Sequence, residues 1–564
     1  MICGLKLTHD GAVSVVDNNR LIFSIEMEKI NNNPRYTEIK DTVSIKRILD
    51  QENIDISAIQ HFVIDGWGGY DPKALAIQPR LEIDKNFNKL TIDFDGVSSK
   101  IKLAQYTEKN LGDRLATSHK FNNLLIGDRQ VEYHSYLHAC NHLFSAYCTS
   151  PFSKRNESSF ILIWDGGMFP RLYYFEAKTK KVNNFGPIFL LIGNIYTIFS
   201  QHFAPFKVKG SFAKDDLSIA GKVMAYIAKG KCREELFDLF DKIIIEHYSN
   251  PMGFANKFAN LFKGLIKKEQ YSDEDILLTF HSYLERTLIQ KLKKKIDRNS
   301  SLERRLCIVG GCALNIKWNS AIRNSGLFSQ VYVPPFPNDS GSAIGAACSL
   351  MVDKLDCSWL DWNVYSGPRL NTPSPLPGWT SRTSSVKELA QILHYINQPV
   401  VLLNDRAELG PRSLGNRSIV AAPQSKAMQT LLNKIKERED YRPVSPVCLE
   451  ENATSIFEPG TRDPYMLFDH KVKNSWKSKI AAVCHIDGTA RLQTVNQTEN
   501  DLLFQLLKEY KSLSNIPMLC NTSANYKGRG FFPDVQSAME WNKVNYVWSH
   551  NILYEKSNKI QFLP

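Results

Sequence analysis

Two short loops, each placed after an apolar segment, constrain the fold of this chain most. The first, Thr8-His9-Asp10-Gly11, separates two apolar stretches, and residues 17–19 (D-N-N) predict a hairpin turn further along. The second, Asp165-Gly166-Gly167, ends the apolar residues 160–164. Small residues in such loops let backbone amides approach a phosphate. Their recurrence about half a domain apart predicts an α/β fold with a duplicated phosphate-binding unit.

Three histidines recur at every fourth position before the second loop. No glycine or proline interrupts residues 134–150, so one helix is predicted, with His134, His138 and His142 on a single face. Histidine is the commonest metal ligand, and a pair four residues apart can hold an ion while leaving positions open for substrate. The alternative is a helix with one or two hydrogen-bonded core histidines, and the spacing alone is compatible with both.

A further ligand-type element follows residues 232–305, whose pattern is polar and helical with breaks at Asn250-Pro251 and at residues 299–301. Residues 306–309 predict a strand, and the segment from Gly310-Gly311 to Asn315 opens a helix. A strand, a Gly-Gly turn and a helix N-terminus form a place for the phosphates or ribose of a nucleotide. Later, Asp339 stands at the entrance of a helix rich in small residues, which indicates close packing beside a ligand. As an N-cap this aspartate would be unremarkable.

The proline-rich residues 366–382 predict a linker between a first domain, residues 1–365, and a second domain, residues 383–564. In the second domain, arginines stand among glycines in residues 406–418, and more cations follow in residues 432–443. Fixed cations on loop backbone suit bound phosphates. Two polar sets near residues 485–494 and 520–525 each follow an apolar strand, where the ligand loops of α/β sheets lie.

Composition limits the class of protein. With 564 residues and 43% hydrophobic content, the chain can form two or more domains with proper cores. Its 70 Lys and Arg exceed its 58 Asp and Glu, and the net charge of +12 favours phosphorylated or polyanionic partners. The 11 cysteines contain no C-x-x-C pair, which argues against a disulfide framework or a zinc knuckle and indicates a reducing cytoplasm. We expect no signal peptide, no transmembrane segment and no membrane partner.

From His9-Asp10 to Asn525, these motifs closely resemble the O-carbamoyltransferases of the nodulation, cephamycin and tobramycin type. The resemblance implies an N-terminal duplicated actin-like (ASKHA) domain, similar to the tRNA threonylcarbamoyl transferases, and a C-terminal YrdC-like α/β domain. It also implies that the YrdC-like domain makes carbamoyl-adenylate from carbamoyl phosphate and ATP, with Mg²⁺ for the ATP. The N-terminal domain would then pass the carbamoyl group to a hydroxyl.

The resemblance assigns a metal set and a catalytic pair. The H-x-x-x-H motif of the family matches His138 and His142, and these two with Asp339 form a two-His, one-carboxylate set that suits Fe(II) or a similar divalent ion. Such an ion would polarise the carbamoyl-adenylate. Asp10, with His9 beside it, is expected to be the general base or to orient the acceptor.

The remaining assignments concern the nucleotide and the phosphates. The residues expected to bind the adenylate in the first domain are Asp165, Gly166, Gly167, Gly310, Gly311 and Asn315. Those expected to bind carbamoyl phosphate and ATP in the second domain are Arg412, Arg417, Lys436, Arg442, His485, Thr489, Arg491 and Asn521.

The motifs say least about the acceptor. The excess of positive charge, with the lysine-rich residues 291–295 outside the family motifs, favours 5-hydroxymethylcytosine in DNA or as a nucleotide, as in the phage branch of the family. A solvated helix face would explain the lysines equally. The alternatives are carbamoylation of a small-molecule hydroxyl, on an antibiotic or a saccharide, and a non-catalytic nucleotide-binding scaffold. The expected location is the cytoplasm of a bacterium or a phage-infected host.

Overall fold

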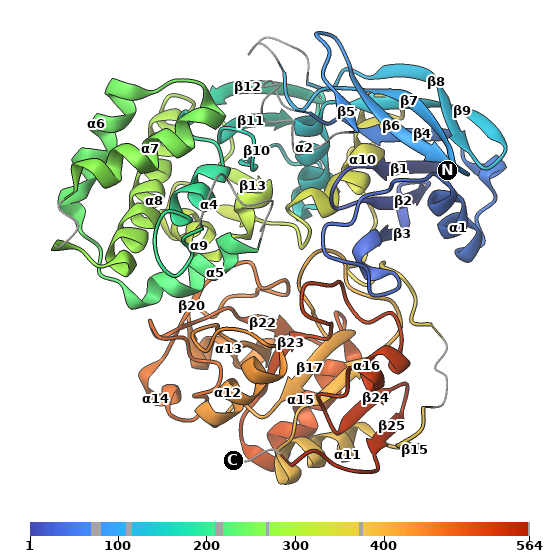
Figure 1. Cartoon of the computed structure of the whole chain (residues 1–564), viewed down its shortest axis with the longest axis vertical. Helices are drawn as coiled ribbons and strands as arrows, with labels where there is room; N and C mark the ends of the chain where they lie inside the picture. The colour runs from blue at the N-terminus through green and yellow to red at the C-terminus, as the bar shows by residue number, and fades with distance from the viewer. Residues whose placement is uncertain (69–79, 109–114, 209–217, 267–269, 372–375, 562–564) are drawn as a thin grey trace. The chain divides into compact units, whose positions relative to one another are not determined.

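The computed structural model of the protein describes the chain except for residues 69–79, 109–114, 209–217, 267–269, 372–375 and 562–564. The chain forms two compact units (Figure 1). The first unit is Met1–Ser24 with Glu38–Trp362, and the second is Ile25–Thr37 with Asn363–Pro564. The division therefore falls at Trp362 rather than at residue 365, and a short segment from the N-terminal part of the sequence belongs to the second unit.

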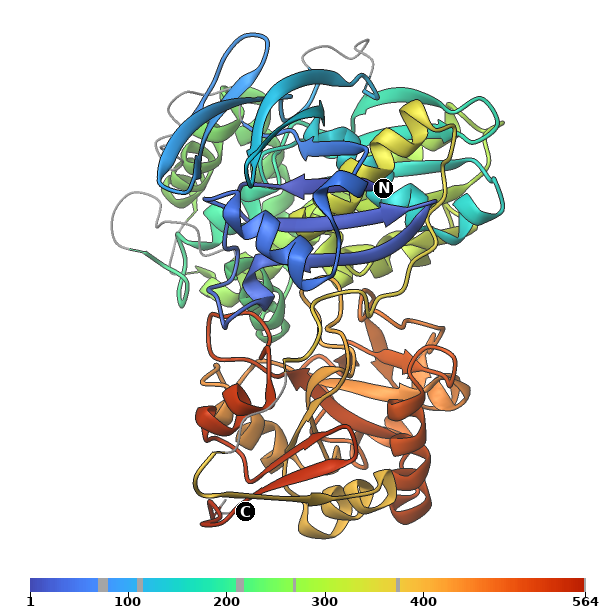
Figure 2. The same ribbon diagram turned by 90° about the vertical axis from the view of Figure 1, so that its right-hand side faces the viewer.

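The first unit begins with a six-stranded sheet in the order β3-β2-β1-β4-β9-β8. Figure 2 shows β1, β2 and β3 side by side in dark blue. Its strands are β1 Ile2–Lys6, β2 Ala12–Asp17, β3 Arg20–Glu26, β4 His61–Asp65, β8 His119–Ile126 and β9 Arg129–Tyr136. Strand β1 runs antiparallel to β2 and parallel to β4. The hairpin turn between β2 and β3 is confirmed, because Asn18 and Asn19 have φ of 43° and 60°, as a mirror-image turn requires.

A five-stranded sheet follows in the order β12-β11-β10-β13-β14. Its strands are β10 Ser159–Ile163, β11 Arg171–Glu176, β12 Lys181–Pro187, β13 Arg305–Val309 and β14 Gln330–Tyr332. Strand β10 runs antiparallel to β11 and parallel to β13, as β1 does with β2 and β4. The strand order of the first sheet is thus repeated, and the Asp10 and Asp165 loops occupy equivalent hairpins, as the two loop motifs predicted.

Two helices, α2 (His138–Thr149) and α10 (Ser342–Lys354), pack against each other in the first unit. Glycine permits this close approach, because any side chain at Gly345 of α10 would collide with the carbonyl of Asn141 in α2. In the same way, a side chain at Gly4 of β1 would collide with the carbonyl of Ala343 in α10. The predicted helix from residue 134 was too long. His134 lies on β9, where it pairs with Val63 and Lys120, and the sheet ladder therefore keeps it out of the helix.

The remaining elements of the first unit form a small sheet and a helical region. The small sheet contains β5 Leu81–Glu82, β6 Asn88–Phe94 and β7 Val97–Leu103. The helices are α1 Val43–Gln51, α3 Pro151–Lys154, α4 Asn194–Ser200, α5 Ile219–Tyr226, α6 Phe237–His247, α7 Pro251–Leu265, α8 Asp273–Asp297 and α9 Ile316–Asn324. Phenylalanine rings join α4, α6, α7 and α8 in one apolar cluster, with Phe199 and Phe280 stacked at 4.0 Å. The predicted helix break before Pro251 is confirmed.

The second unit is built on an eight-stranded sheet in the order β15-β25-β24-β16-β17-β23-β18-β22. Its strands are β15 Trp379–Thr383, β16 Val400–Leu403, β17 Arg417–Ala421, β18 Ser445–Leu449, β22 Gln493–Val495, β23 Met518–Ser523, β24 Tyr546–Ser549 and β25 Ile552–Lys556. A small sheet contains β19 Phe457–Glu458, β20 His470–Val472 and β21 Thr489–Ala490. The helices are α11 Val386–Gln391, α12 Lys426–Ile435, α13 Glu450–Ile456, α14 Asn474–Lys477, α15 Asp501–Ser514 and α16 Val535–Trp541.

The end of the predicted linker is part of this sheet. Strand β15 pairs antiparallel with β25, so residues 379–382 form an edge strand rather than a free connection. Across the described ranges, none of the helices combines the length and the apolar character that crossing a bilayer requires.

Candidate functional site

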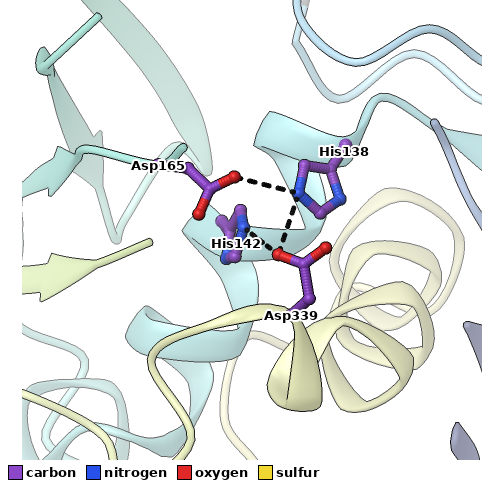
Figure 3. A group of neighbouring side chains, drawn as sticks. All are labelled: His138, His142, Asp165 and Asp339. Atoms are coloured by element: carbon purple, nitrogen blue, oxygen red, sulfur yellow. Dashed lines mark ion pairs between the residues drawn. The ribbon is translucent and has the colours of Figure 1, made fainter. Parts of the chain in front are cut away.

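Four buried side chains of the first unit gather where α2 begins (Figure 3). His138 and His142 lie one turn apart in α2, Asp165 follows β10, and Asp339 lies in the short 3-10 helix before α10. One potential ligand atom of each residue lies within 4.8 Å of those of the other three. The structure thus brings together the three residues predicted to bind a metal and adds Asp165, which was expected to contact the adenylate.

The atoms that face one another are those that bind metal ions. Oδ1 of Asp339 lies 3.4 Å from Nε2 of His138 and 3.4 Å from Nε2 of His142. Nε2 of His138 also lies 3.9 Å from Oδ2 of Asp165. Among the described residues, neither Nε2 atom has a hydrogen-bond partner, although both are buried. Such atoms are costly unless something binds them, and two imidazoles with two carboxylates fit a divalent metal ion.

Asp65, at the end of β4, forms a hydrogen bond with His138 on the side of the ring opposite Nε2. Its Oδ2 atom accepts a hydrogen bond from Nδ1 of His138 at 2.8 Å, and its Oδ1 atom accepts one from Asn141 at 2.6 Å. Lys6, at the end of β1, donates to Oδ2 of Asp65 and lies 2.9 Å from Oδ2 of Asp339. Because an ionised carboxylate only accepts, Nδ1 of His138 carries a proton, and in the neutral ring that can bind a metal ion the lone pair of Nε2 faces Asp165 and Asp339.

Sequence reasoning missed both Lys6 and Asp65. A signal for Asp65 was present, because Asp65-Gly66 ends an apolar strand as Asp165-Gly166 does. Lys6 is the one charged residue in an otherwise apolar strand and is 1% exposed.

The electrostatics keep the carboxylates ionised. Burial by itself raises the pKa of Asp339, but Lys6 and His138 outweigh it and hold that pKa well below its ordinary value. Burial likewise acts to raise the pKa of Asp165, yet the neighbouring histidines lower it overall. For His138 burial acts to lower the pKa, whereas Asp65 and Asp339 raise it well above the ordinary value. The pocket is therefore anionic and attracts cations.

Two aromatic side chains form a wall of this site. The ring of Tyr106 stacks on His138 at 4.7 Å, and its hydroxyl donates to Oδ2 of Asp165. The ring of Trp67 lies 5.1 Å from His138 and 4.6 Å from His9, and Nζ of Lys6 lies 3.7 Å from its centre. Rings in these positions orient the polar groups and exclude water. Neither was identified in the sequence.

The predicted catalytic pair lies beside the group of His138, His142, Asp165 and Asp339, the candidate metal-binding group. Nδ1 of His9 lies 2.8 Å from Oδ2 of Asp10, and Nε2 of His9 lies 3.6 Å from Oδ2 of Asp339. The loop places Asp10 at φ 56°, in the left-handed region. The side chain of His9 is 29% exposed, whereas that of Asp10 is 7% exposed. The carboxylate of Asp10 therefore orients the imidazole of His9, and the imidazole is the more accessible of the two.

Of the residues predicted to bind the adenylate, some lie close to Asp165, whereas Asn315 contacts its own helix. The amide of Gly311 donates to Oδ1 of Asp165 at 2.7 Å. Gly310 has φ 94°, and its backbone lies so close to the carbonyl of Trp164 that a side chain would not fit. Gly166 packs against Asn194, and Gly167 against Tyr106. Asn315 is turned towards its own helix, where Oδ1 caps the amides of Lys317 and Trp318. Its carboxamide thus has a structural role.

The second unit contains a cluster of buried cations. The pKa of Arg412 is held well below its ordinary value by burial and by the charges of Arg491, Arg35 and Arg442. Burial, with Arg442 and Arg438, lowers the pKa of Arg491 to about 10. Nε of Arg412 is buried and, in the described part of the chain, has no hydrogen-bond partner. A bound anion would offset the electrostatic repulsion between these cations.

Arg35 and Arg438 are members that sequence reasoning missed. Arg438 stands two residues after Lys436 and could have been found in the same basic segment. Arg35 carries no sequence signal, since it belongs to the second unit only through folding.

Other predicted phosphate-binding residues hold loops in place. The guanidinium of Arg417 donates to four backbone carbonyls, those of Asn404, Asp405, Asn416 and Pro368. Nζ of Lys436 donates to the carbonyl of Ser523 and to two oxygens of Asn525. Both side chains therefore hold loops of the second unit in place through these contacts.

The remaining predicted residues of the second unit also have protein partners. The carboxamide of Asn521 donates to the carbonyl of Ser413 and to Gln493. Asp487 lies 3.2 Å from Nδ1 of His485 and accepts from the hydroxyl of Thr489 at 2.7 Å. Nε2 of His485 is buried and has no hydrogen-bond partner among the described residues.

Comparison with known proteins covers nearly the whole chain. Residues 1–348 match the family model described as carbamoyltransferase N-terminus, and residues 390–556 match the one described as carbamoyltransferase C-terminus. Nodulation protein U of Rhizobium tropici is 44% identical over 100% of this chain and 97% of its own length. The 3'-hydroxymethylcephem-O-carbamoyltransferase of Amycolatopsis lactamdurans is 31% identical over 94% of each chain.

Proposed function

The chain belongs to the carbamoyltransferase family, and from this membership we propose that it transfers a carbamoyl group from carbamoyl-adenylate to the hydroxyl of a small molecule. The observation that carries this proposal is the buried set of His138, His142, Asp165 and Asp339 beside the His9-Asp10 pair, with two Nε2 atoms that have no hydrogen-bond partner in the described part of the chain.

We assign the two steps of the reaction to the two units. The repeated strand order of the first unit supports an actin-like (ASKHA) domain similar to the threonylcarbamoyl transferases, and the cation cluster of the second supports a YrdC-like domain that binds phosphates. In the second unit, water hydrolyses the bond between the carbamoyl group and the phosphate of carbamoyl phosphate, which releases phosphate and carbamate, and a carbamate oxygen then attacks the α-phosphate of ATP. Pyrophosphate leaves and carbamoyl-adenylate forms, with Mg²⁺ as the partner of the ATP phosphates. The guanidinium groups of Arg412, Arg442 and Arg491 neutralise the phosphate oxygens.

In the first unit the acceptor hydroxyl must lose a proton as its oxygen attacks the carbamoyl carbon and AMP leaves. His9 is placed to accept that proton at Nε2, because Asp10 holds Nδ1 and the ring is the accessible member of the pair. Asp10 is then the orienting group. A divalent ion, Fe(II) or similar, held by His138, His142, Asp165 and Asp339 would supply Lewis-acid polarisation of the carbamoyl oxygen. Trp67 and Tyr106 keep the reacting groups away from water.

For the acceptor, a small molecule is better supported than DNA. The lysine-rich residues 291–295, which favoured a nucleic acid in the sequence, are partly engaged within the protein. Lys293 pairs with Asp297 at 2.9 Å, and Lys295 donates to the carbonyl of Phe185. Moreover, the name of the Amycolatopsis relative specifies a hydroxymethyl group on a cephem, a small molecule, as its acceptor. An antibiotic or saccharide hydroxyl is therefore our first choice, and 5-hydroxymethylcytosine is the second.

One experiment tests both the reaction and the acceptor. Purified protein is given carbamoyl phosphate, ATP and, in parallel, a hydroxymethylcephem, an oligosaccharide, 5-hydroxymethylcytosine nucleotide, and single-stranded and duplex DNA that contain this base. We expect a small-molecule product heavier by one carbamoyl group, only when both donors are present. Carbamoylated DNA that declines steeply with salt would favour the nucleic acid instead. Transfer without ATP would overturn the two-step scheme.

A further inference from the structure

Lys6 is a buried charge that the proposed reaction does not use. Its side chain is 1% exposed, and Nζ lies 2.9 Å from Oδ2 of Asp65 and 2.9 Å from Oδ2 of Asp339. The ring of Trp67 covers it at 3.7 Å. A lysine is rarely buried so completely unless it is paired, and removing it from water is costly even then. Its position between one metal-binding carboxylate and one supporting carboxylate calls for a role at the metal site.

The contacts of Asp339 show a division between its two oxygens. Oδ2 faces Lys6, whereas Oδ1 faces the Nε2 atoms of His138 and His142. Lys6 thereby forms an ion pair with the oxygen that faces away from His138 and His142, and Oδ1 is left for a metal ion. Through Asp65 it also contacts the group that fixes the tautomer of His138.

Lys6 also determines the charge that the site presents. Within the four-residue group and its supporting residues Lys6 and Asp65, three carboxylates contribute three negative charges and Lys6 contributes one positive charge. This leaves two negative charges once His138 and His142 are neutral, as binding a metal ion requires. Asp10 is not part of this count, because it contacts His9 and not the group itself. A divalent ion balances these charges, whereas a trivalent ion leaves an excess of one positive charge. Without the charge of Lys6, three negative charges remain, and a trivalent ion balances them. In a buried site such an excess is poorly screened, so it affects binding strongly.

We propose that Lys6 makes this site select divalent over trivalent cations, by setting its charge and by holding one oxygen of Asp339. The inference rests on the proposed metal centre. It assigns to Lys6 the role of a positioning residue that never touches the carbamoyl group.

The test uses the full-length protein, stripped of metal with a chelator, and measures the affinity for Mn²⁺ and for Tb³⁺ by calorimetry and terbium luminescence. In Lys6→Met the ratio of the two dissociation constants should shift at least tenfold in favour of Tb³⁺. Lys6→Arg keeps the charge, and its ratio should stay within about threefold of the original protein. Lys6→Gln retains a donor for the two carboxylates without the charge. It should shift like Lys6→Met and serves if that variant does not fold.

Removing a negative charge, instead of the positive charge of Lys6, gives a second and independent test. Asp65→Asn removes one negative charge while Lys6 remains, so the ratio should move at least tenfold in favour of Mn²⁺. Folding of each variant is checked by circular dichroism. A ratio that stays the same in Lys6→Met, Lys6→Gln and Asp65→Asn would overturn the role of Lys6. If the unmodified protein binds neither ion, the metal centre itself fails and the role of Lys6 fails with it.

Discussion

Nδ1 of His138 lies 2.8 Å from Oδ2 of Asp65, so the supporting carboxylate determines which nitrogen of the ring faces the other acidic residues. In Asp65→Asn the new amide can donate to Nδ1 and stabilise the other tautomer. We expect the affinity for Mn²⁺ to fall roughly 10–100-fold, the usual effect of losing a partner of a metal-binding histidine. Titration calorimetry measures this fall, and Asp353→Asn, which lies away from the site against Tyr136, is the control. Equal affinities for both variants would contradict the assignment.

His134 and His138 make a matched pair that separates the metal site from the neighbouring sheet. His138→Ala removes a buried candidate ligand, so transfer to the acceptor should be lost while carbamoyl-adenylate formation in the second unit persists. His134→Ala alters β9 at a position outside the metal-binding group and should be mild. The two half-reactions are followed by exchange of labelled pyrophosphate into ATP and by mass spectrometry of the acceptor. If both substitutions impair both half-reactions equally, the histidines serve folding instead.

Arg412 and Arg417 lie five residues apart, and replacing each with alanine should impair a different property: binding of the donor substrates for Arg412 and stability for Arg417. Arg412→Ala removes a buried guanidinium with an unpartnered Nε, so donor binding should weaken by roughly 1.5–3 kcal/mol with little change in stability. Arg417→Ala leaves backbone carbonyls without their donor, so stability should fall by roughly 3 kcal/mol or more. Calorimetry with carbamoyl phosphate or ATP measures the first effect, and urea unfolding measures the second. Supplied carbamoyl-adenylate should restore transfer in Arg412→Ala, and failure of this rescue would refute the division into two steps.

Glu26 should make stability depend on pH. Its Oε1 atom accepts from Nζ of Lys29 at 2.6 Å and from the amide of Gly410 at 2.8 Å. Burial, although opposed by Lys29, raises the pKa of Glu26 from 4.5 to about 7. Because the folded pKa is the higher one, this contribution to stability is complete below pH 4.5 and is lost as the pH rises through 7.

Glu26→Gln cannot lose that contribution. From pH 4.5 to above pH 7, the free energy of unfolding of the variant should therefore rise relative to that of the original protein by about 3 kcal/mol. Urea unfolding at pH 5 and pH 7.5 measures most of this change. A difference between the two proteins that is the same at both pH values would show that Glu26 titrates normally.

The sequence alone determined the features that depend on neighbouring residues. The hairpin turn at Asn18-Asn19, the strands before Asp165 and Gly310, and the helix break at Pro251 follow from local turn chemistry and apolar patterning. The family resemblance, carried over residue by residue, identified the pair His138 and His142, together with Asp339 nearly two hundred residues away. Family membership also followed from motifs, and the comparisons confirm it.

Tertiary structure decided what depends on contacts between distant segments. Periodicity alone placed His134 on the helix, but pairing of β9 with β4 and β8 removes it, because sheet ladders form with strands that the local sequence does not specify. Asp165 joined the metal-binding group because β10 ends beside α2, and Lys6 and Asp65 joined because β1 and β4 are parallel neighbours. Arg35 entered the cation cluster only because its segment folds with the second unit. Arg417 and Lys436 were predicted from the sequence to bind phosphate, and only the fold shows that their buried donors also satisfy backbone carbonyls.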